Sequence, residues 1–265
     1  MGIRRFYLIS FLFSWSIWIT GSFLWQNNSI LLIAIGGLGP VIALLYVLFW
    51  TYDKANRKSY LQRVTKVRNI PATVWLITLL LPVMLVFFAS GFDSLTEPEP
   101  VRFSEIALDG LSSAGGLFFV FHVFFGPLPE ELAWRGYAYY ELLKKGVLKA
   151  QIIVASLWAL WHMPLFFIPD SYQAGLGLFT AGFWFFFINV FASSFIIGWL
   201  YLKSRHSIII VFLFHYLINV TGELIALSDT GETAKHILLA ISGIVFFLLS
   251  AQTQKSKNKK RKTID

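Results

Sequence analysis

Two adjacent carboxylates and an arginine stand in an otherwise apolar part of the chain, at Glu130, Glu131 and Arg135. A charge at the centre of a membrane helix costs about 2.5–3.5 kcal/mol on insertion scales, so charges kept there usually have a function. Pro129 suits the first turn of a helix, where its missing N–H costs nothing, and acidic side chains favour that turn through the helix dipole. The sequence therefore predicts a helix that opens at Glu130 and runs to about Lys145.

The two glutamates should differ in role because they point to different sides of this helix. Glu131 and Arg135 are four residues apart with the acid first, which is the better orientation for an ion pair. Glu130 points about 100° away around the helix axis. We therefore expect Glu131 to be neutralised by Arg135 and Glu130 to be left free for chemistry.

Two histidines and an asparagine also lie inside predicted membrane spans. His162 precedes a Met-Pro pair, and since proline disfavours helix in the residue before it, His162 should lie beside a break in its helix. His215 and Asn219, four residues apart, share one face of a helix. A single buried histidine is usually a packing residue, which is how we interpret His122 and His236. His162, His215 and Asn219 occur together with the glutamate pair, and this combination indicates a functional site.

Such a set of side chains could hydrolyse an amide. A glutamate in a cleft can act as general base on a water molecule, and a histidine can share that water or carry its proton. A second histidine and an asparagine amide can donate hydrogen bonds to the developing oxyanion. Alternatively, a glutamate and two histidines could ligate a divalent metal that activates the water. The sequence lacks the His-Glu-x-x-His, Gly-x-Ser-Gly and Gly-x-Gly-Asp motifs of other intramembrane proteases.

The composition indicates a polytopic membrane protein. Hydrophobic residues make up 57% of the 265-residue chain, and several runs reach the ~20 apolar residues that span a bilayer. The net charge of +8 comes from basic residues between the apolar runs, which fits the positive-inside rule better than nucleic-acid binding. The absence of cysteine excludes disulfides and a thiolate zinc site.

Eight membrane spans are predicted within one integral membrane domain, residues 1–251, whose motif-bearing core covers about 110–225. Gly36, Gly37, Gly39 and Pro40 should kink the second span or allow close helix contact. Whether 104–145 forms one kinked helix or two stays open, and the basic segment 252–265 predicts a disordered cytoplasmic tail. The predicted spans are 6–25, 29–50, 71–92, 105–125, 149–168, 176–202, 207–227 and 236–250.

The distribution of basic residues predicts the orientation. If the N-terminus is cytoplasmic and the chain crosses eight times, Arg102 and Lys235 alone fall outside, and Arg135 lies in the membrane. All other lysines and arginines then lie on the cytoplasmic side. The positive-inside rule therefore predicts a multi-pass protein of the cell membrane with both termini in the cytoplasm.

At these residues the chain resembles the CPBP family, the CAAX-protease and bacteriocin-processing membrane proteins also called the Abi family. The family pattern is Glu-Glu-x-x-x-Arg, then an aromatic residue four positions before a histidine, then His-x-x-x-Asn. Trp158 stands where the family often has phenylalanine; taken alone, we would interpret it as a packing residue. The resemblance covers about residues 110–225, and the three motifs run from Glu130 to Arg135, from Trp158 to His162 and from His215 to Asn219.

The resemblance implies a role for each of these residues. Glu130 would activate the water with support from Glu131 and Arg135, His162 would assist at the water, and His215 and Asn219 would stabilise the oxyanion. The implied fold is an all-α polytopic membrane bundle of about eight transmembrane helices around a cytoplasm-facing cavity. The family is named for metalloproteases, but its eukaryotic CAAX-processing members look metal-free in mechanism. No cofactor is required on the preferred mechanism, and a divalent metal such as zinc, held by Glu130, His162 and His215, stays open.

The predicted function is that of an intramembrane endopeptidase acting on a membrane-associated or lipidated, CAAX-like peptide. The expected partners are membrane lipids and that peptide, without nucleic acid; the sequence does not define the oligomeric state. Two alternatives are a non-catalytic bacteriocin self-immunity protein or scaffold, and a transporter. The complete set of six polar residues argues against the first. The lack of paired discontinuous helices in two related halves argues against the second.

Overall fold

Helices long and apolar enough to cross a membrane make up most of the described chain. The computed structural model describes residues 2–24, 29–96, 115–116, 118–225 and 227–262, and within them the regular structure is entirely helical. The predicted all-α membrane bundle is confirmed. Six candidate spans are present: α1 (Gly2–Leu24), α2 with α3 (Ser29–Gly37 and Gly39–Trp50), α5 (Ala72–Thr96), α9 with η4 (Val147–Trp161 and Met163–Phe167), α11 (Ala181–Lys203) and the first 26 residues of α13 (Asp229–Lys262).

Two of the eight predicted spans need separate comment. The seventh corresponds to α12 (Ile208–Leu224), an apolar helix of 17 residues. The fourth, 105–125, lies mostly outside the described residues, but 118–124 is helical. Gly126, with φ −143° and ψ −106°, separates this helix from α7 (Pro127–Ala133). The described part of 104–145 is therefore two helices rather than one kinked helix.

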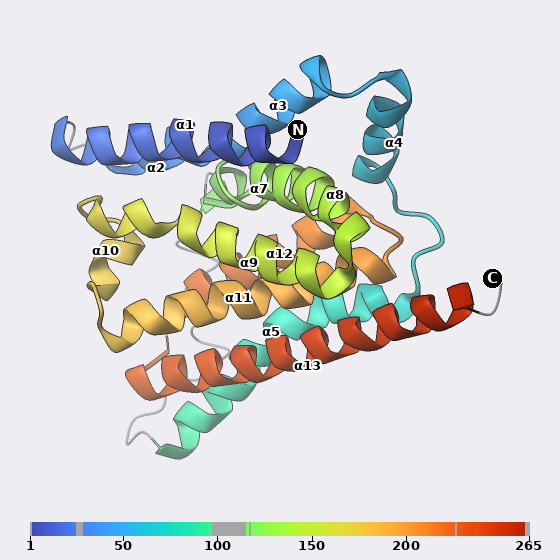
Figure 1. Cartoon of the computed structure of the whole chain (residues 1–265). Coiled ribbons are helices and arrows are strands. Elements are labelled where there is room, and N and C mark those ends of the chain that lie inside the picture. The colour runs from blue at the N-terminus through green and yellow to red at the C-terminus, as the bar shows by residue number, and fades with distance from the viewer. Residues whose placement is uncertain (1, 25–28, 97–114, 117, 226, 263–265) are drawn as a thin grey trace.

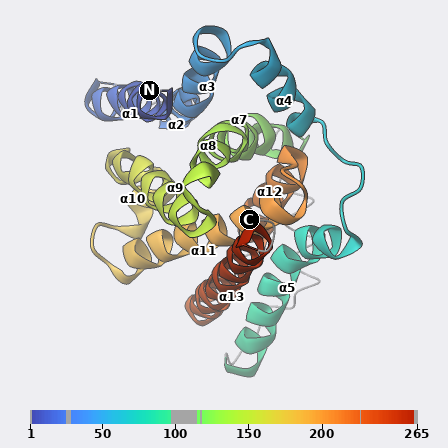
Figure 2. The same cartoon turned by 45° about the vertical axis from the view of Figure 1, so that its right-hand side comes forward.

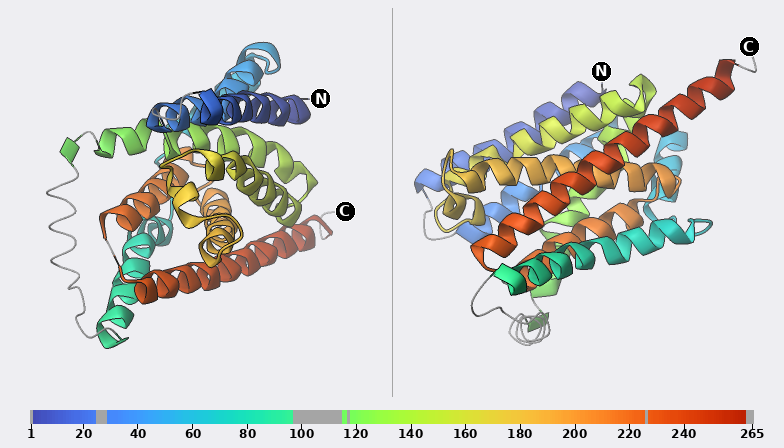
Figure 3. Two further views of the ribbon diagram at one scale, coloured as in Figure 1. Left: turned by 90° about the vertical axis from the view of Figure 1, so that its left-hand side faces the viewer. Right: turned by 90° about the horizontal axis from the view of Figure 1, so that it is seen from below.

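The helix that carries the glutamate pair lies inside the bundle. α7 packs between α3 and α12, and α12 in turn packs on α5 (Figure 2). On the other side, α11 packs against both α9 and α13 (Figure 1). The long helix α13 runs the length of the bundle across α11 (Figure 3, right). This arrangement places the acidic motif against neighbouring helices on several sides.

Small residues allow α1 to approach α2 and α3 closely. A Cβ atom on Gly36 would collide with the indole of Trp18, and one on Gly39 would collide with the carbonyl of Ser10. The Trp18 indole N–H donates to the carbonyl of Leu32 at 3.1 Å. The predicted close helix contact at these glycines is confirmed.

The basic segments gather at one end of the bundle, where both termini and α4 (Lys54–Val64) also lie (Figure 1). Lys66 donates to the carbonyl of Arg205 at 3.0 Å. Arg63 donates to the carbonyl of Gly136, also at 3.0 Å. We call this the basic end.

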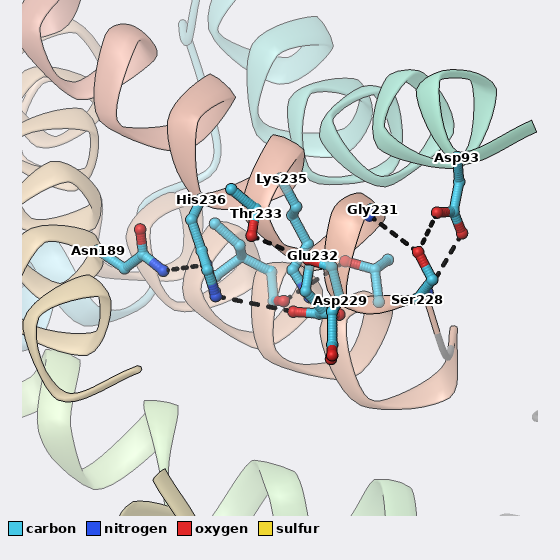
Figure 4. A network of polar contacts seen from close by, with 11 residues as sticks. Asp93, Asn189, Ser228, Asp229, Gly231, Glu232, Thr233, Lys235 and His236 are labelled. Atoms are coloured by element: carbon cyan, nitrogen blue, oxygen red, sulfur yellow. Dashed lines mark hydrogen bonds and ion pairs between the residues drawn. The ribbon is translucent and has the colours of Figure 1, made fainter. Parts of the chain in front are cut away.

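The opposite end is joined by a different set of contacts. The buried carboxylate of Asp93, near the end of α5, accepts hydrogen bonds from the backbone N–H of Ser228 at 3.2 Å and from its hydroxyl (Figure 4). The same hydroxyl accepts from the N–H of Gly231 at 3.2 Å, in the first turn of α13. These contacts fix the end of α5 to the start of α13.

The helix α13 continues through Lys262, where the basic composition predicts a disordered tail. Lysine, arginine and glutamine are good helix formers, and extending an existing helix is easier than starting one. The preceding turns are held by two contacts with the start of α9. Gln151 donates to Ser250 at 2.8 Å, and the backbone N–H of Leu148 donates to Gln254 at 3.2 Å.

Candidate active site

The acidic motif lies on a helix of mixed type. α7 begins at Pro127, as expected for a proline in the first turn, and continues as a π-helix, η2 (Trp134–Tyr139). The segment ends through α8 (Tyr140–Leu142) and η3 (Leu143–Lys145) at Gly146. The predicted helix is present but begins three residues earlier than predicted, and its π-helical segment was not predicted. Such wide turns are rare and occur often at functional sites.

Glu131 and Arg135 form the predicted ion pair. Arg135 Nη1 donates to Glu131 Oε1 at 2.7 Å, with side chains 1% and 0% exposed. The same oxygen accepts from His215 Nδ1 at 2.9 Å. Arg135 Nη2 donates to Ser194 on α11 at 3.1 Å, and the guanidinium carbon lies 4.4 Å from the centre of the Trp158 ring. A buried charge is tolerated when it is paired and hydrogen-bonded in this way.

Glu130 has a different environment from its neighbour. Its carboxylate accepts a hydrogen bond of 2.6 Å from the Trp158 indole N–H, and the residue, 8% exposed, lines a cavity. No basic side chain forms an ion pair with Glu130 in the described part of the chain. The contact of Trp158 with Glu130 was not predicted, because the sequence pattern alone indicated a packing residue. The sequence signal that could have indicated this contact is the position of Trp158 four residues before His162.

His162 lies at the predicted helix break. α9 ends at Trp161, and η4 begins after His162 with Pro164 in its first turn. His162 Nδ1 lies 2.7 Å from the carbonyl oxygen of Trp158. Because a carbonyl oxygen only accepts, Nδ1 must carry the proton, and Nε2 of the neutral ring is left as an acceptor. Trp158 therefore holds both Glu130, through its indole, and His162, through its carbonyl.

These side chains meet at a cavity of about 700 Å³. His215 and Asn219 both line it, one helical turn apart on α12. Glu131 and Arg135 do not line it and lie behind its wall. The structure thus brings all six predicted residues together, but in two layers. Aromatic and aliphatic side chains form much of the remaining wall, among them Phe121, Phe125, Leu165, Phe186 and Val190.

His122 and His236, which we interpreted as packing residues, also line this cavity. His122 Nε2 pairs with Glu223 at 2.9 Å. His236 Nδ1 accepts from Asn189 at 2.6 Å, beside Lys235 and Glu232 (Figure 4). Each histidine is therefore satisfied by a polar side-chain partner, which agrees with a structural role, but its place in the cavity wall was not predicted. Those partners lie on other helices, which sequence spacing does not show.

A divalent metal at this site would need Glu130, His162 and His215 as ligands. In the part of the chain that the structure describes, no three or more His, Asp or Glu side chains form a group that could hold a metal ion. The hydrogen bonds to Glu130 Oε2 and to Nδ1 of each site histidine do not involve the other Glu130 oxygen or either Nε2 atom, so they do not themselves exclude a metal. Glu130, His162 and His215 do not form such a three-residue group in this arrangement, and no step is derived through a metal.

The described helical membrane bundle carries a glutamate, two histidines and an asparagine around an internal cavity, and groups of these types can support hydrolysis. The family model described as Type II CAAX prenyl endopeptidase Rce1-like matches residues 112–221, which include all three motifs. The CAAX prenyl protease 2 of Methanococcus maripaludis is 28% identical over 272 residues, covering 92% of this chain and 93% of that protein. These matches support the resemblance to CPBP-type membrane proteases that the motifs predict, and they support a protease.

Proposed function

We propose that this protein is an intramembrane endopeptidase that hydrolyses a peptide bond in a membrane-associated or lipidated, CAAX-like peptide, using a water molecule activated by Glu130. The observation that carries the proposal is the split between the adjacent glutamates. Glu131 pairs with Arg135 and His215 behind the cavity wall. Glu130 faces the cavity without a basic partner among the described residues. The names of the matched family and relative support a CAAX-like substrate.

Glu130 and His162 have separate roles in the attack of water on the peptide bond. Glu130 removes a proton from water as the water oxygen attacks the scissile carbonyl carbon, and the free Nε2 of His162 accepts the second water hydrogen bond. The C–N bond then breaks, and the protonated Glu130 returns its proton to the leaving amine. Water is thus divided between the new carboxyl group and the new amine, and Glu130 ends in its starting state.

His215 and Asn219 are placed to stabilise the oxyanion of the tetrahedral intermediate. The Asn219 amide is a donor without any change of protonation. His215 uses Nδ1 to donate to Glu131, so its Nε2 donates to the oxyanion when the ring carries a second proton. The buried carboxylate of Glu131 would stabilise that imidazolium. Pre-positioned donors of this kind are usually the largest single contribution to such catalysis.

The experiment that tests the proposal is cleavage of peptides by the purified, reconstituted protein. Matched hydrophobic peptides with and without a prenylated cysteine would be incubated with the wild type and with Glu130→Gln, each with and without a chelator. We expect products from the wild type that require Glu130 and resist the chelator. Loss of cleavage on chelation, restored by zinc, would contradict the metal-free mechanism. Peptide binding without cleavage under every condition would contradict the protease assignment and favour an immunity or scaffold role.

A further inference from the structure

The segment between Lys54 and Arg68 contains six basic residues and no acidic residue. Its helix, α4, lies at the basic end and runs crosswise to the spans α1 and α11 (Figure 1). A helix that crosses the ends of membrane spans lies along the membrane surface rather than through the bilayer. α4 is therefore positioned at the level of the lipid headgroups.

Aromatic side chains beside α4 mark the same level. Trp50, the last residue of α3, is 74% exposed and stacks on Tyr46 with 5.6 Å between the ring centres. Exposed tryptophan and tyrosine at the ends of membrane helices are typical of the membrane–water interface. Arg5 of α1 donates to the Tyr46 hydroxyl at 3.2 Å. Arg57 of α4 donates to the carbonyl of Phe49 at 3.1 Å. Two arginines from distant segments are thus held at this interface.

The outer face of α4 combines basic groups with one apolar group. Spacings of three and four residues place on this face Lys54, Arg57, Lys58 and Leu61. All four are exposed, Leu61 by 59%. Lys54 and Lys58 form no ion pair with an acidic side chain among the described residues. On an interfacial helix, apolar groups enter the acyl boundary while the cations reach anionic headgroups.

The inner face of α4 is attached to the helix that carries the acidic motif. Tyr60 is 2% exposed, and its hydroxyl donates to the carbonyl of Leu132 at 3.1 Å, one residue after Glu131. Arg63 is 7% exposed and donates to the carbonyl of Gly136. A ligand bound to the outer face of α4 would therefore also stabilise the position of the acidic-motif helix.

We propose that the outer face of α4, together with Arg5, binds the headgroups of anionic phospholipids. The cations attract the phosphate, and Leu61 fixes the depth of α4 at the acyl boundary. The alternative is that these basic residues only orient the chain in the membrane, in which case any two exposed lysines at the basic end would be equivalent. The proposal does not depend on the proposed peptidase activity.

Native mass spectrometry of the purified full-length protein in detergent distinguishes the two cases. Equal amounts of phosphatidylcholine and phosphatidylglycerol would be added, and bound lipid counted. Lys54→Gln/Lys58→Gln should weaken phosphatidylglycerol binding about 25-fold, at roughly fivefold for each lysine. The control, Lys145→Gln/Lys149→Gln, removes the same charge from exposed positions near the start of α9 and should bind like the wild type. Equal losses in both double variants, or no loss in the α4 variant, would overturn the proposal.

Thermal unfolding gives a second measurement. A ligand that binds only the folded protein raises the unfolding midpoint. Phosphatidylglycerol should raise the wild-type midpoint more than phosphatidylcholine or soluble glycerol phosphate does. Lys54→Gln/Lys58→Gln should lose this increase, and Lys54→Arg/Lys58→Arg should retain it. Without lipid, all variants should unfold at the wild-type midpoint, because both lysines are exposed. An equal increase with glycerol phosphate, or a lower midpoint of the glutamine variant without lipid, would overturn the lipid assignment.

Discussion

Glu130 and Glu131 are neighbours in sequence but occupy two regions with opposite properties. The Glu131 region is a closed cluster in which Glu131 pairs with Arg135 and accepts from His215, while Arg135 also donates to Ser194. The Glu130 region is the wall of a cavity, where the carboxylate has the Trp158 indole as its hydrogen-bond donor. The comparison shows how one helix can use one buried carboxylate to hold the structure and keep the next one available for chemistry.

His215 connects the two regions. Its Nδ1 contacts Glu131, while the residue also lines the cavity that contains Glu130. A change in the closed cluster can therefore reach the cavity through the orientation of this ring. Substitutions that act on one region and spare the other are the clearest tests of the division.

The largest effect is expected from Glu130→Gln. The amide keeps an oxygen that can accept from Trp158 but cannot take a proton from water, and general-base catalysis contributes about 10²–10⁴-fold. Peptide cleavage should fall by about 10³-fold or more, with an unchanged thermal unfolding midpoint in detergent. His162→Ala should also abolish cleavage in a folded protein. Full activity in either variant would contradict the roles assigned to these residues.

Arg135→Ala should act on stability. It leaves Glu131 buried without its cation, and breaking a buried ion pair costs about 3–5 kcal/mol. We expect a lower folded yield and a clearly lower unfolding midpoint. Lys144→Ala is the matched control, because Lys144 pairs with Glu141 at the same 2.7 Å but is 69% exposed, and exposed pairs contribute little. Equal stability of the Arg135 and Lys144 variants would refute the structural role of the closed cluster.

A smaller effect is expected from Trp158→Phe. It removes the N–H donor to Glu130 and keeps an aromatic ring, and a hydrogen bond to a charged group contributes about 1.5–3 kcal/mol. Cleavage should fall by about tenfold or somewhat more without being lost. Trp15→Phe is the control, since its indole donates to the Trp161 carbonyl at 3.1 Å and does not line the cavity. A similar loss of rate in both variants would show that the Trp158 donor has no special role.

The smallest effect is expected from Ser194→Ala, which removes one of the hydrogen bonds of Arg135 and leaves the ion pair in place. The cost should be about 1 kcal/mol of stability, the usual contribution of one hydrogen bond. The rate of cleavage per folded molecule should stay within about twofold of the wild type. A large loss of rate at unchanged stability would mean that the closed cluster contributes directly to catalysis.

Several features followed from the sequence because they depend on neighbours within one helix. The Glu131–Arg135 pair is a consequence of i,i+4 geometry, and the break beside His162 follows from the restrictions that Pro164 imposes. Apolar run lengths gave the membrane helices, and the order of the three motifs gave the family resemblance. Each of these inferences needs only the chain's local periodicity.

Other features were decided by tertiary structure, because they depend on how each helix is rotated and displaced against its neighbours. Trp158 reaches Glu130 from α9, Ser194 reaches Arg135 from α11, and His236 meets Asn189 across a helix boundary. The cavity likewise results from where several helices leave space together. Sequence spacing specifies which side chains share a face of one helix, and only the packing of helices specifies what that face meets.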